Sequence, residues 1–271
     1  MKRFEKKSFW ALVLVLAMAM SLLVGCGGNN TADSSGSTNQ SGSNSGSSSN
    51  SSSSGDSAEV EKDTLIVAVA ADSGDLNPHG NYSTSLARIK AQVYEGLFFL
   101  TYENELIPWL ATGYEWKDDT TVEIKLREGV QFHCGGEMTA EDVMFSLEKV
   151  NESAQKTIVE KIDFENSKII DDYTIELKCV EPYAPLITNL SYLPASIFSK
   201  EGYEANGGDW TKPIGTGPYV WGEWVTGSEQ WVHAFENYWG EPVGVPNIQF
   251  KVIAEATNRV IELETGNCDL A

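Results

Sequence analysis

The feature that most limits what this chain can fold into is a long stretch of low complexity near its start. Residues 27–57 are nearly all Ser, Gly, Asn and Thr, and none of their aliphatic side chains is larger than that of Ala32. Such a segment cannot bury enough apolar surface to offset the entropy that is lost on ordering. We therefore expect the folded part to comprise residues 59–271, which is enough for one large domain or two small ones.

The residues before this stretch have the organisation of a secretory signal. Basic residues at positions 2–7 precede an apolar run from Phe9 to Val24, which is shorter than the ~20 residues that a membrane-spanning helix needs. The run leads into Gly25 and Cys26, a junction that resembles the lipobox of bacterial lipoproteins. This resemblance implies that a signal peptide of residues 1–25 is removed and that Cys26 is lipidated. An uncleaved signal anchor and a free thiol at an ordinary cleavage site are the alternatives.

Residues 26–58 then read as the lipidated cysteine followed by a flexible tether. A Gly/Ser-rich chain of this length has a root-mean-square reach of roughly 30 Å. The sequence thus predicts an extracytoplasmic protein that is anchored by Cys26 to the outer face of the cell membrane. A disordered stub without a role would have the same composition.

Charge and metal-binding residue types exclude several classes of function. The chain carries a net charge of −20, which argues against binding to nucleic acid or lying flat on an anionic membrane. Beyond Cys26 the cysteines are odd in number and form no C-x-x-C pair, so a zinc or redox site has little support. We expect no cofactor and no metal, and structural or surface roles for the histidines. The residues concerned are Cys134, Cys179, Cys268, His79, His133 and His233.

Hydrophobic periodicity in residues 59–271 indicates an α/β fold. Residues 64–70 read as a strand that is buried on both faces, and a turn-rich loop follows at 71–78. Other strands are predicted at 97–100, 122–127, 173–179, 219–235 (a hairpin), 247–253 and, as a beginning, 268–271. Helices are predicted over 86–97, from Thr139 with Asp142 as its acidic N3 residue, and over 256–265 before Gly266.

Enzyme signatures are absent from the sequence. It contains no Gly-x-Ser-x-Gly elbow, no His-Glu-x-x-His and no Walker loop, and Gly215-Thr216-Gly217 is too short for a dinucleotide fingerprint. Seven tryptophans follow Cys26, and they could either pack the fold or form a surface that stacks on sugars. A secreted carbohydrate-active enzyme therefore stays open as a rival to a binding protein.

Several short motifs, in a fixed order, are more specific than any of these signals. They occupy residues 106–111, 122–133, 139–147, 213–219, 237–240 and 263–271. Together they resemble the family 5 extracellular solute-binding proteins of ABC importers, which include dipeptide- and oligopeptide-binding proteins. The resemblance runs from Thr64 to Ala271. One departure is Cys134-Gly135-Gly136, where the family usually has an aspartate and a glycine.

This resemblance implies a non-enzymatic, two-lobed α/β fold of the periplasmic-binding-protein type, in its large peptide-binding form. The first lobe would comprise residues 59–81 and 186–271, with an inserted subdomain at about 82–185. The second lobe would be missing, so the chain would be an N-terminal fragment. The implied partners are a short peptide and an ABC permease with its ATPase, and the mechanism is hinge closure around the ligand. Oligosaccharides and nickel complexes are alternative ligands on the same scaffold.

The ligand-binding residues are expected in the loop after the first strand. Relatives hold a peptide as an added strand through backbone hydrogen bonds. We predict contacts from Ala71, Asp72, Ser73 and Gly74, with Tyr82 beside them. Asp72 would either meet a ligand amine or only cap the turn. Two structural expectations concern other motifs. Arg127 should pair with a carboxylate, and the two glycines of residues 213–218 should allow a tight chain crossing.

Overall fold

The computed structural model describes residues 62–80 and 84–271, with side chains from residue 87 onward in the second range. The predictions for the signal peptide, Cys26, the tether and Tyr82 therefore lie outside the described residues. Among the described residues, no helix has both the length and the apolar character required to cross a membrane. The described residues belong to one compact unit.

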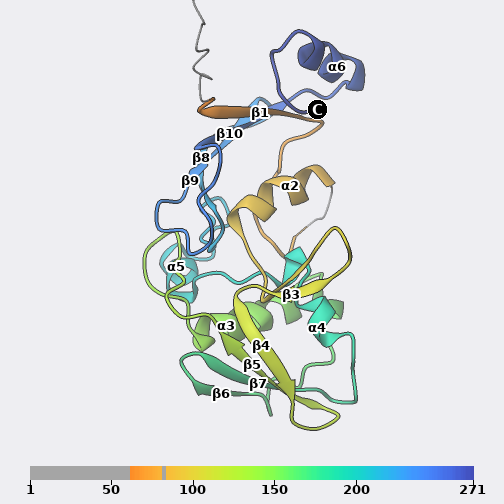
Figure 1. Cartoon of the computed structure of the whole chain (residues 1–271), viewed down its shortest axis with the longest axis vertical. Helices are drawn as coiled ribbons and strands as arrows, with labels where there is room; N and C mark the ends of the chain where they lie inside the picture. Colours follow the sequence, from red (N-terminus) through yellow and green to blue (C-terminus); the bar gives the residue numbers. More distant parts are fainter. Residues whose placement is uncertain (1–61, 81–83) are drawn as a thin grey trace, which may run out of the picture. The chain divides into compact units, whose positions relative to one another are not determined.

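The first sheet has the strand order β1-β10-β9-β8, and Figure 1 shows its four strands near α2. Its strands are β1 (Thr64–Val69), β8 (Tyr219–Val225), β9 (Glu229–Ala234) and β10 (Asn247–Val252). β1 runs parallel to β10, and the other two pairs are antiparallel. The free edge of β1 meets the end of the chain, where the Ala68 amide donates to the Leu270 carbonyl at 2.8 Å. The strand predicted to begin at 268–271 is thus present as a single parallel bridge between Val67 and Leu270.

The second sheet has the order β4-β5-β7-β6 and is antiparallel throughout. Its strands are β4 (Ala111–Trp116), β5 (Thr121–Leu126), β6 (Lys168–Asp171) and β7 (Thr174–Lys178), and a separate hairpin pairs β2 (Phe98–Leu100) with β3 (Leu106–Pro108). Ile124 on β5 and Ile175 on β7 are fully buried, as the predicted alternation requires. Cys179 is also buried, beside the end of β7.

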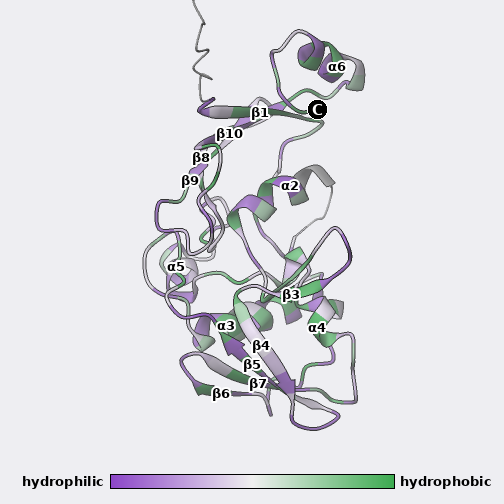
Figure 2. Cartoon of the chain, viewed as in Figure 1, coloured by the Kyte–Doolittle hydropathy of each residue, from purple (hydrophilic) through white to green (hydrophobic). Residues whose placement is uncertain are grey.

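Three helices overlap those predicted at 86–97, from Thr139 and at 256–265, whereas two short helices between residues 186 and 205 were not predicted. The helices are α2 (Thr84–Val93), α3 (Ala140–Asn151), α4 (Leu186–Asn189), α5 (Lys200–Ala205), α6 (Ala256–Glu264) and the short 3₁₀ helices η1 (Lys156–Ile158) and η2 (Leu193–Ala195). At the start of α3 the Thr139 amide donates to Asp142 Oδ2 at 3.0 Å, as the predicted cap requires. Gly266 follows α6 with φ +74°. In Figure 2, apolar and hydrophilic residues are interspersed along α6, none of which is buried.

One helix prediction was too long. Periodicity placed Leu97 on the same helix as Val93, but α2 ends at Val93 and Leu97 immediately precedes strand β2. The chain leaves the helix because Glu95 pairs with Ile197 in an antiparallel β-bridge. A contact with a segment about a hundred residues away along the sequence therefore overrides the local pattern.

Buried apolar residues form two separate clusters. The subdomain core contains only residues between Leu97 and Ile197. The lobe core contains Val67 to Tyr94 and then Phe198 to Phe250. The chain thus passes from one core to the other twice, at residues 94–97 and again at 197–198. The subdomain boundaries near 82 and 185 stay a prediction.

Candidate functional site

The loop after β1 is held in place by one of its predicted ligand residues, Asp72. Its Oδ1 accepts from the Gly74 amide at 2.7 Å. Its Oδ2 accepts from the Gly227 amide at 2.7 Å and from Trp224 Nε1 at 3.0 Å. Partial burial would raise the pKa of Asp72, but these three hydrogen bonds outweigh it and lower the pKa. Asp72 thus joins the loop to the β8–β9 turn, and its contact with a ligand amine stays a prediction.

The next residue of the loop, Ser73, is also held by hydrogen bonds, to Gln230 on β9. Its side chain is buried, its amide donates to Gln230 Oε1 at 3.1 Å, and Gln230 Nε2 donates to its hydroxyl. Ala71 and Gly74 on either side are exposed. Within the described residues, no hydrogen bond is assigned to the backbone groups of Ala71. The side chains of Asp72 and Ser73 therefore fasten the loop to the β8–β9 hairpin, and Ala71 and Gly74 are its exposed residues.

A buried lysine holds the second half of this loop against α2. Lys90 is 2% exposed, and its ammonium group donates to the Asn77 carbonyl at 2.6 Å and lies 3.4 Å from Asp75 Oδ1. His79 beside it is 3% exposed and packs edge-on against Phe198. Burial, together with the Lys90 charge, lowers the pKa of His79 to about 4. His79 is thus a neutral structural residue at pH 7, which is one of the two roles that the sequence predicted.

A hollow of about 490 Å³ lies next to this loop, and the sequence reasoning missed it. It is lined by Gln155, Ile158, Ser191, Tyr192, Leu193 and Pro194. Gln155 Nε2 donates to the Gly80 carbonyl at 3.4 Å, which brings this hollow beside the end of the loop. The two lining segments are separated by more than thirty residues in the sequence, so no local signal joins them.

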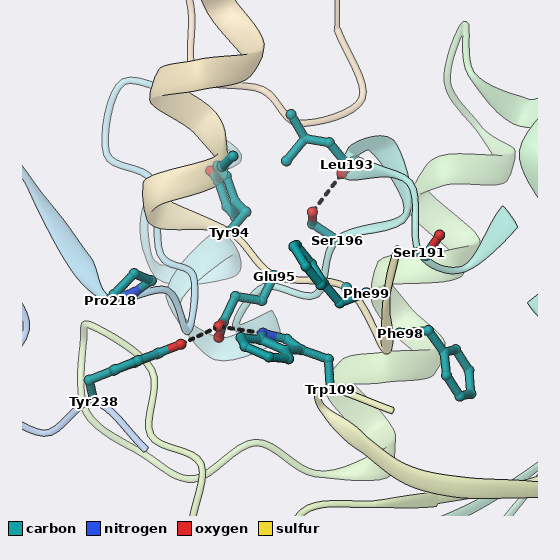
Figure 3. A pocket seen from close by; sticks show the side chains of 12 residues that line it. Tyr94, Glu95, Phe98, Phe99, Trp109, Ser191, Leu193, Ser196, Pro218 and Tyr238 are labelled. Atoms are coloured by element: carbon teal, nitrogen blue, oxygen red, sulfur yellow. Dashed lines mark hydrogen bonds between the residues drawn. The ribbon is translucent and has the colours of Figure 1, made fainter. Parts of the chain in front are cut away.

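The motifs that carried the family resemblance converge on one buried carboxylate, Glu95, which is 7% exposed. Its Oε1 accepts from Trp109 Nε1 at 2.7 Å and from the Tyr238 hydroxyl at 2.8 Å. Its Oε2 accepts from the Thr216 hydroxyl at 2.8 Å and from Trp239 Nε1 at 2.9 Å. Figure 3 shows Glu95 between Tyr238 and Trp109, at the wall of a pocket of about 280 Å³.

The electrostatics of Glu95 follow from this arrangement. Burial raises its pKa, and the four hydrogen bonds oppose that rise. No cation forms an ion pair with it within the part of the chain that the structure describes. Because both oxygens already accept two hydrogen bonds, Glu95 is an anchor within the fold and has little capacity left for a ligand.

Two glycines that the sequence singled out lie where the chain passes the end of α2. A Cβ atom on Gly215 would lie 2.0 Å from the Val93 carbonyl oxygen, and one on Gly217 would lie 2.5 Å from that of Gln92. The Gly217 amide donates to the Val93 carbonyl at 3.0 Å. The predicted tight crossing is confirmed.

The prediction for Arg127 was wrong. Its Nε donates to the Trp109 carbonyl at 3.1 Å, and its guanidinium lies 4.4 Å from the centroid of the Trp239 ring. Within residues 62–80 and 84–271, no carboxylate lies at ion-pair distance from it. Arg127 follows the last residue of β5, so it faces the indole pair instead of a neighbouring strand.

A comparison with known families agrees with this arrangement. The model described as "Bacterial extracellular solute-binding proteins, family 5 Middle" matches residues 105–271. The chain belongs to this family. Members of family 5 are extracellular binding proteins, not enzymes, as the sequence predicted.

Individual relatives of family 5 bind different solutes. The glutathione-binding protein GsiB of Escherichia coli K12 is 28% identical over 214 residues, which are 76% of this chain and 41% of GsiB. The periplasmic binding protein DppA of Helicobacter pylori, solved with the peptide STSA, is 26% identical with a TM-score of 0.69 over 76% of this chain and 45% of DppA. NikZ of Campylobacter jejuni, solved with Ni(L-His), is 27% identical with a TM-score of 0.68 over 76% and 42%.

These matches confirm the predicted α/β fold of the periplasmic-binding-protein type. The chain spans less than half the length of the relatives that it matches. Among the described residues, no group of three or more His, Cys, Asp or Glu side chains could hold a metal ion. Cys134, Cys179 and Cys268 are free thiols, of which only Cys134 is exposed.

Proposed function

We propose that this chain provides the first lobe of a substrate-binding protein that captures short peptides for an ABC importer. In the complete protein, a second lobe would close over the ligand, and the closed form would be presented to the permease and its ATPase. Lipid at Cys26 would hold the receptor on the outer face of the membrane, where tethering raises its effective concentration near the permease.

The loop after β1 is the observation that carries this proposal. Hydrogen bonds of Asp72 and Ser73 fix the loop to the β8–β9 hairpin, while Ala71 and Gly74 are exposed. Preorganised backbone groups can add an extended peptide with little dependence on its side chains. The match to DppA with a bound peptide supports a peptide ligand.

The hollow beside this loop would accept a side chain of the peptide. Ile158, Leu193 and Pro194 give it apolar walls, and Tyr192 at its rim is 44% exposed. Because Gln155 joins it to Gly80, the hollow would lie within reach of a peptide bound along the loop. We therefore propose that it favours an apolar residue in the ligand.

Two other ligand classes remain to be separated by experiment. The match to NikZ, which was solved with Ni(L-His), makes a nickel complex an alternative ligand. An oligosaccharide has less support, because none of the seven tryptophans in the described residues is fully exposed on the surface, where it could stack on a sugar.

The test is calorimetry on the complete mature protein with tetrapeptides, nickel–histidine and a trisaccharide. We expect saturable one-to-one binding of peptides without turnover, and tighter binding when one residue is apolar. Tyr192→Ala should weaken the apolar peptides by roughly tenfold, while the matched change Tyr102→Ala, at a fully exposed tyrosine, should leave binding unchanged. Binding of nickel–histidine alone, or release of product from a glycan, would reject the peptide proposal.

A further inference from the structure

The two chain segments that connect the cores are paired with each other. The outgoing segment carries Glu95 and the returning segment carries Ile197, and the Ile197 amide donates to the Glu95 carbonyl at 2.9 Å. We call this pair the double crossing. Every covalent path between the lobe core and the subdomain core runs through one of its two segments.

The Glu95 side chain ties the double crossing to three further segments. Trp109 comes from the turn between β3 and β4, Thr216 from the loop before β8, and Tyr238 and Trp239 from the connection between β9 and β10. Trp109 and Trp239 also pack edge-to-face, with ring centroids 5.3 Å apart. One side chain therefore joins segments that belong to both cores.

The donor pattern requires a carboxylate at this position. An indole N–H can only donate, and the two indoles reach different oxygens of Glu95. A glutamine side chain has one oxygen, which accepts, and one NH2 group, which donates. One of the two indole N–H groups would therefore face another donor. A buried donor without an acceptor destabilises the fold, because it has lost its hydrogen bond to water. The geometry thus selects the ionised glutamate, in which both oxygens accept.

We infer that Glu95 is a positioning residue whose ionised carboxylate holds the double crossing, so that the lobe core and the subdomain core move as one body. This claim concerns the fold and is independent of the ligand. Its consequence rests on the proposed function. The loop at Ala71–Gly74 and the hollow lined by Ile158 and Tyr192 would stay at a constant distance from each other while a ligand binds.

Native-state hydrogen exchange on the 271-residue chain can test the inference. The reporter is the Ile197 amide, and the references are strand amides of β5 and β10, one strand for each core. In the Glu95→Gln variant we expect the hydrogen of the Ile197 amide to exchange at least about tenfold faster, relative to the reference amides. The reason is that the double crossing opens while each core stays folded. Glu103→Gln, which changes the charge equally at an exposed site, should have no such effect.

A milder variant keeps the test valid if Glu95→Gln fails to fold. Thr216→Val removes one donor with almost no change in shape, and among the described residues the only hydrogen-bond partner of its hydroxyl is Glu95. This variant should also accelerate hydrogen exchange of the Ile197 amide more than that of the reference amides, by a smaller factor. Equal acceleration of Ile197 and the reference strands would overturn the inference, since Glu95 would then only add to global stability. An unchanged Ile197 rate in the variants would overturn it as well.

Discussion

At the scale of single residues, the polar side chains near the proposed site mostly serve the fold. Asp72 caps its own turn and fastens it to the β8–β9 turn, and Lys90 fastens the second half of the same loop to α2. Each is a buried or half-buried group with its hydrogen bonds directed into the protein. A ligand would meet the backbone that these side chains hold in place.

The lipid anchor can be tested by a single substitution. Cys26→Ala removes the thiol that the lipobox resemblance assigns to lipidation. We expect the complete variant protein to leave the membrane fraction and to appear in the soluble extracytoplasmic fraction. A variant that stays in membranes, with residues 1–25 still attached, would show that the segment is a signal anchor.

The stability of the folded part should fall in mild acid because of His79. Its pKa is about 4 in the folded chain, below its ordinary value of 6.5, so the unfolded chain binds the proton first as the pH falls. The free energy of unfolding should thus drop between pH 6.5 and 4, by up to roughly 3 kcal/mol from this residue.

Urea denaturation at several pH values measures this effect. His79→Phe, which keeps an aromatic ring against Phe198, should make the pH dependence shallower. Some pH dependence of stability should remain in this variant, because burial lowers the pKa of His133 to about 4 as well. His233→Gln should act in the opposite direction, because hydrogen bonds with Asn247 and Glu223 raise the pKa of this half-exposed histidine. An unchanged slope in His79→Phe would contradict the assignment.

At the scale of elements, the end of α2 is the most crowded point of the fold. The helix stops at Val93, the chain turns into the bridge with Ile197, and the loop at residues 215–217 passes over the last helical carbonyls. Only a residue without Cβ fits this crossing. Packing therefore explains the family motif in this loop.

A methyl group at this crossing should be poorly tolerated. Gly215→Ala would set its Cβ 2.0 Å from the Val93 carbonyl oxygen, which forces backbone to move. We expect a loss of at least about 2–3 kcal/mol in the free energy of unfolding, or failure to fold. Gly244→Ala, where nothing lies within 4 Å, should change stability by less than about 0.5 kcal/mol in the same thermal or urea melts. Equal effects would show that the crossing can relax.

At the scale of the whole molecule, the chain supplies two cores and one side of a proposed binding cleft. It covers 45% of DppA and 42% of NikZ. Proteins that bind by closure take their affinity from contacts on both sides of the cleft, because burial of the ligand strengthens each polar contact.

The 271-residue chain by itself should therefore bind peptides weakly or not at all. Calorimetry with the tetrapeptides that bind the complete protein should give no saturation at micromolar concentrations. Micromolar or tighter binding would show that the first lobe carries most of the contacts and that closure adds little.

The sequence by itself determined the strands β1, β5, β7 and β10, the start of α3 and the end of α6, because local periodicity and capping residues encode each of these. It also indicated the family, through short motifs in a fixed order. It also placed the loop after β1 correctly. It could not show that Glu95 collects four donors from distant motifs, that Arg127 stacks on Trp239, or that Gln155 brings a hollow beside Gly80. Only the tertiary structure decided these contacts, since each joins residues whose proximity depends on how the two cores pack.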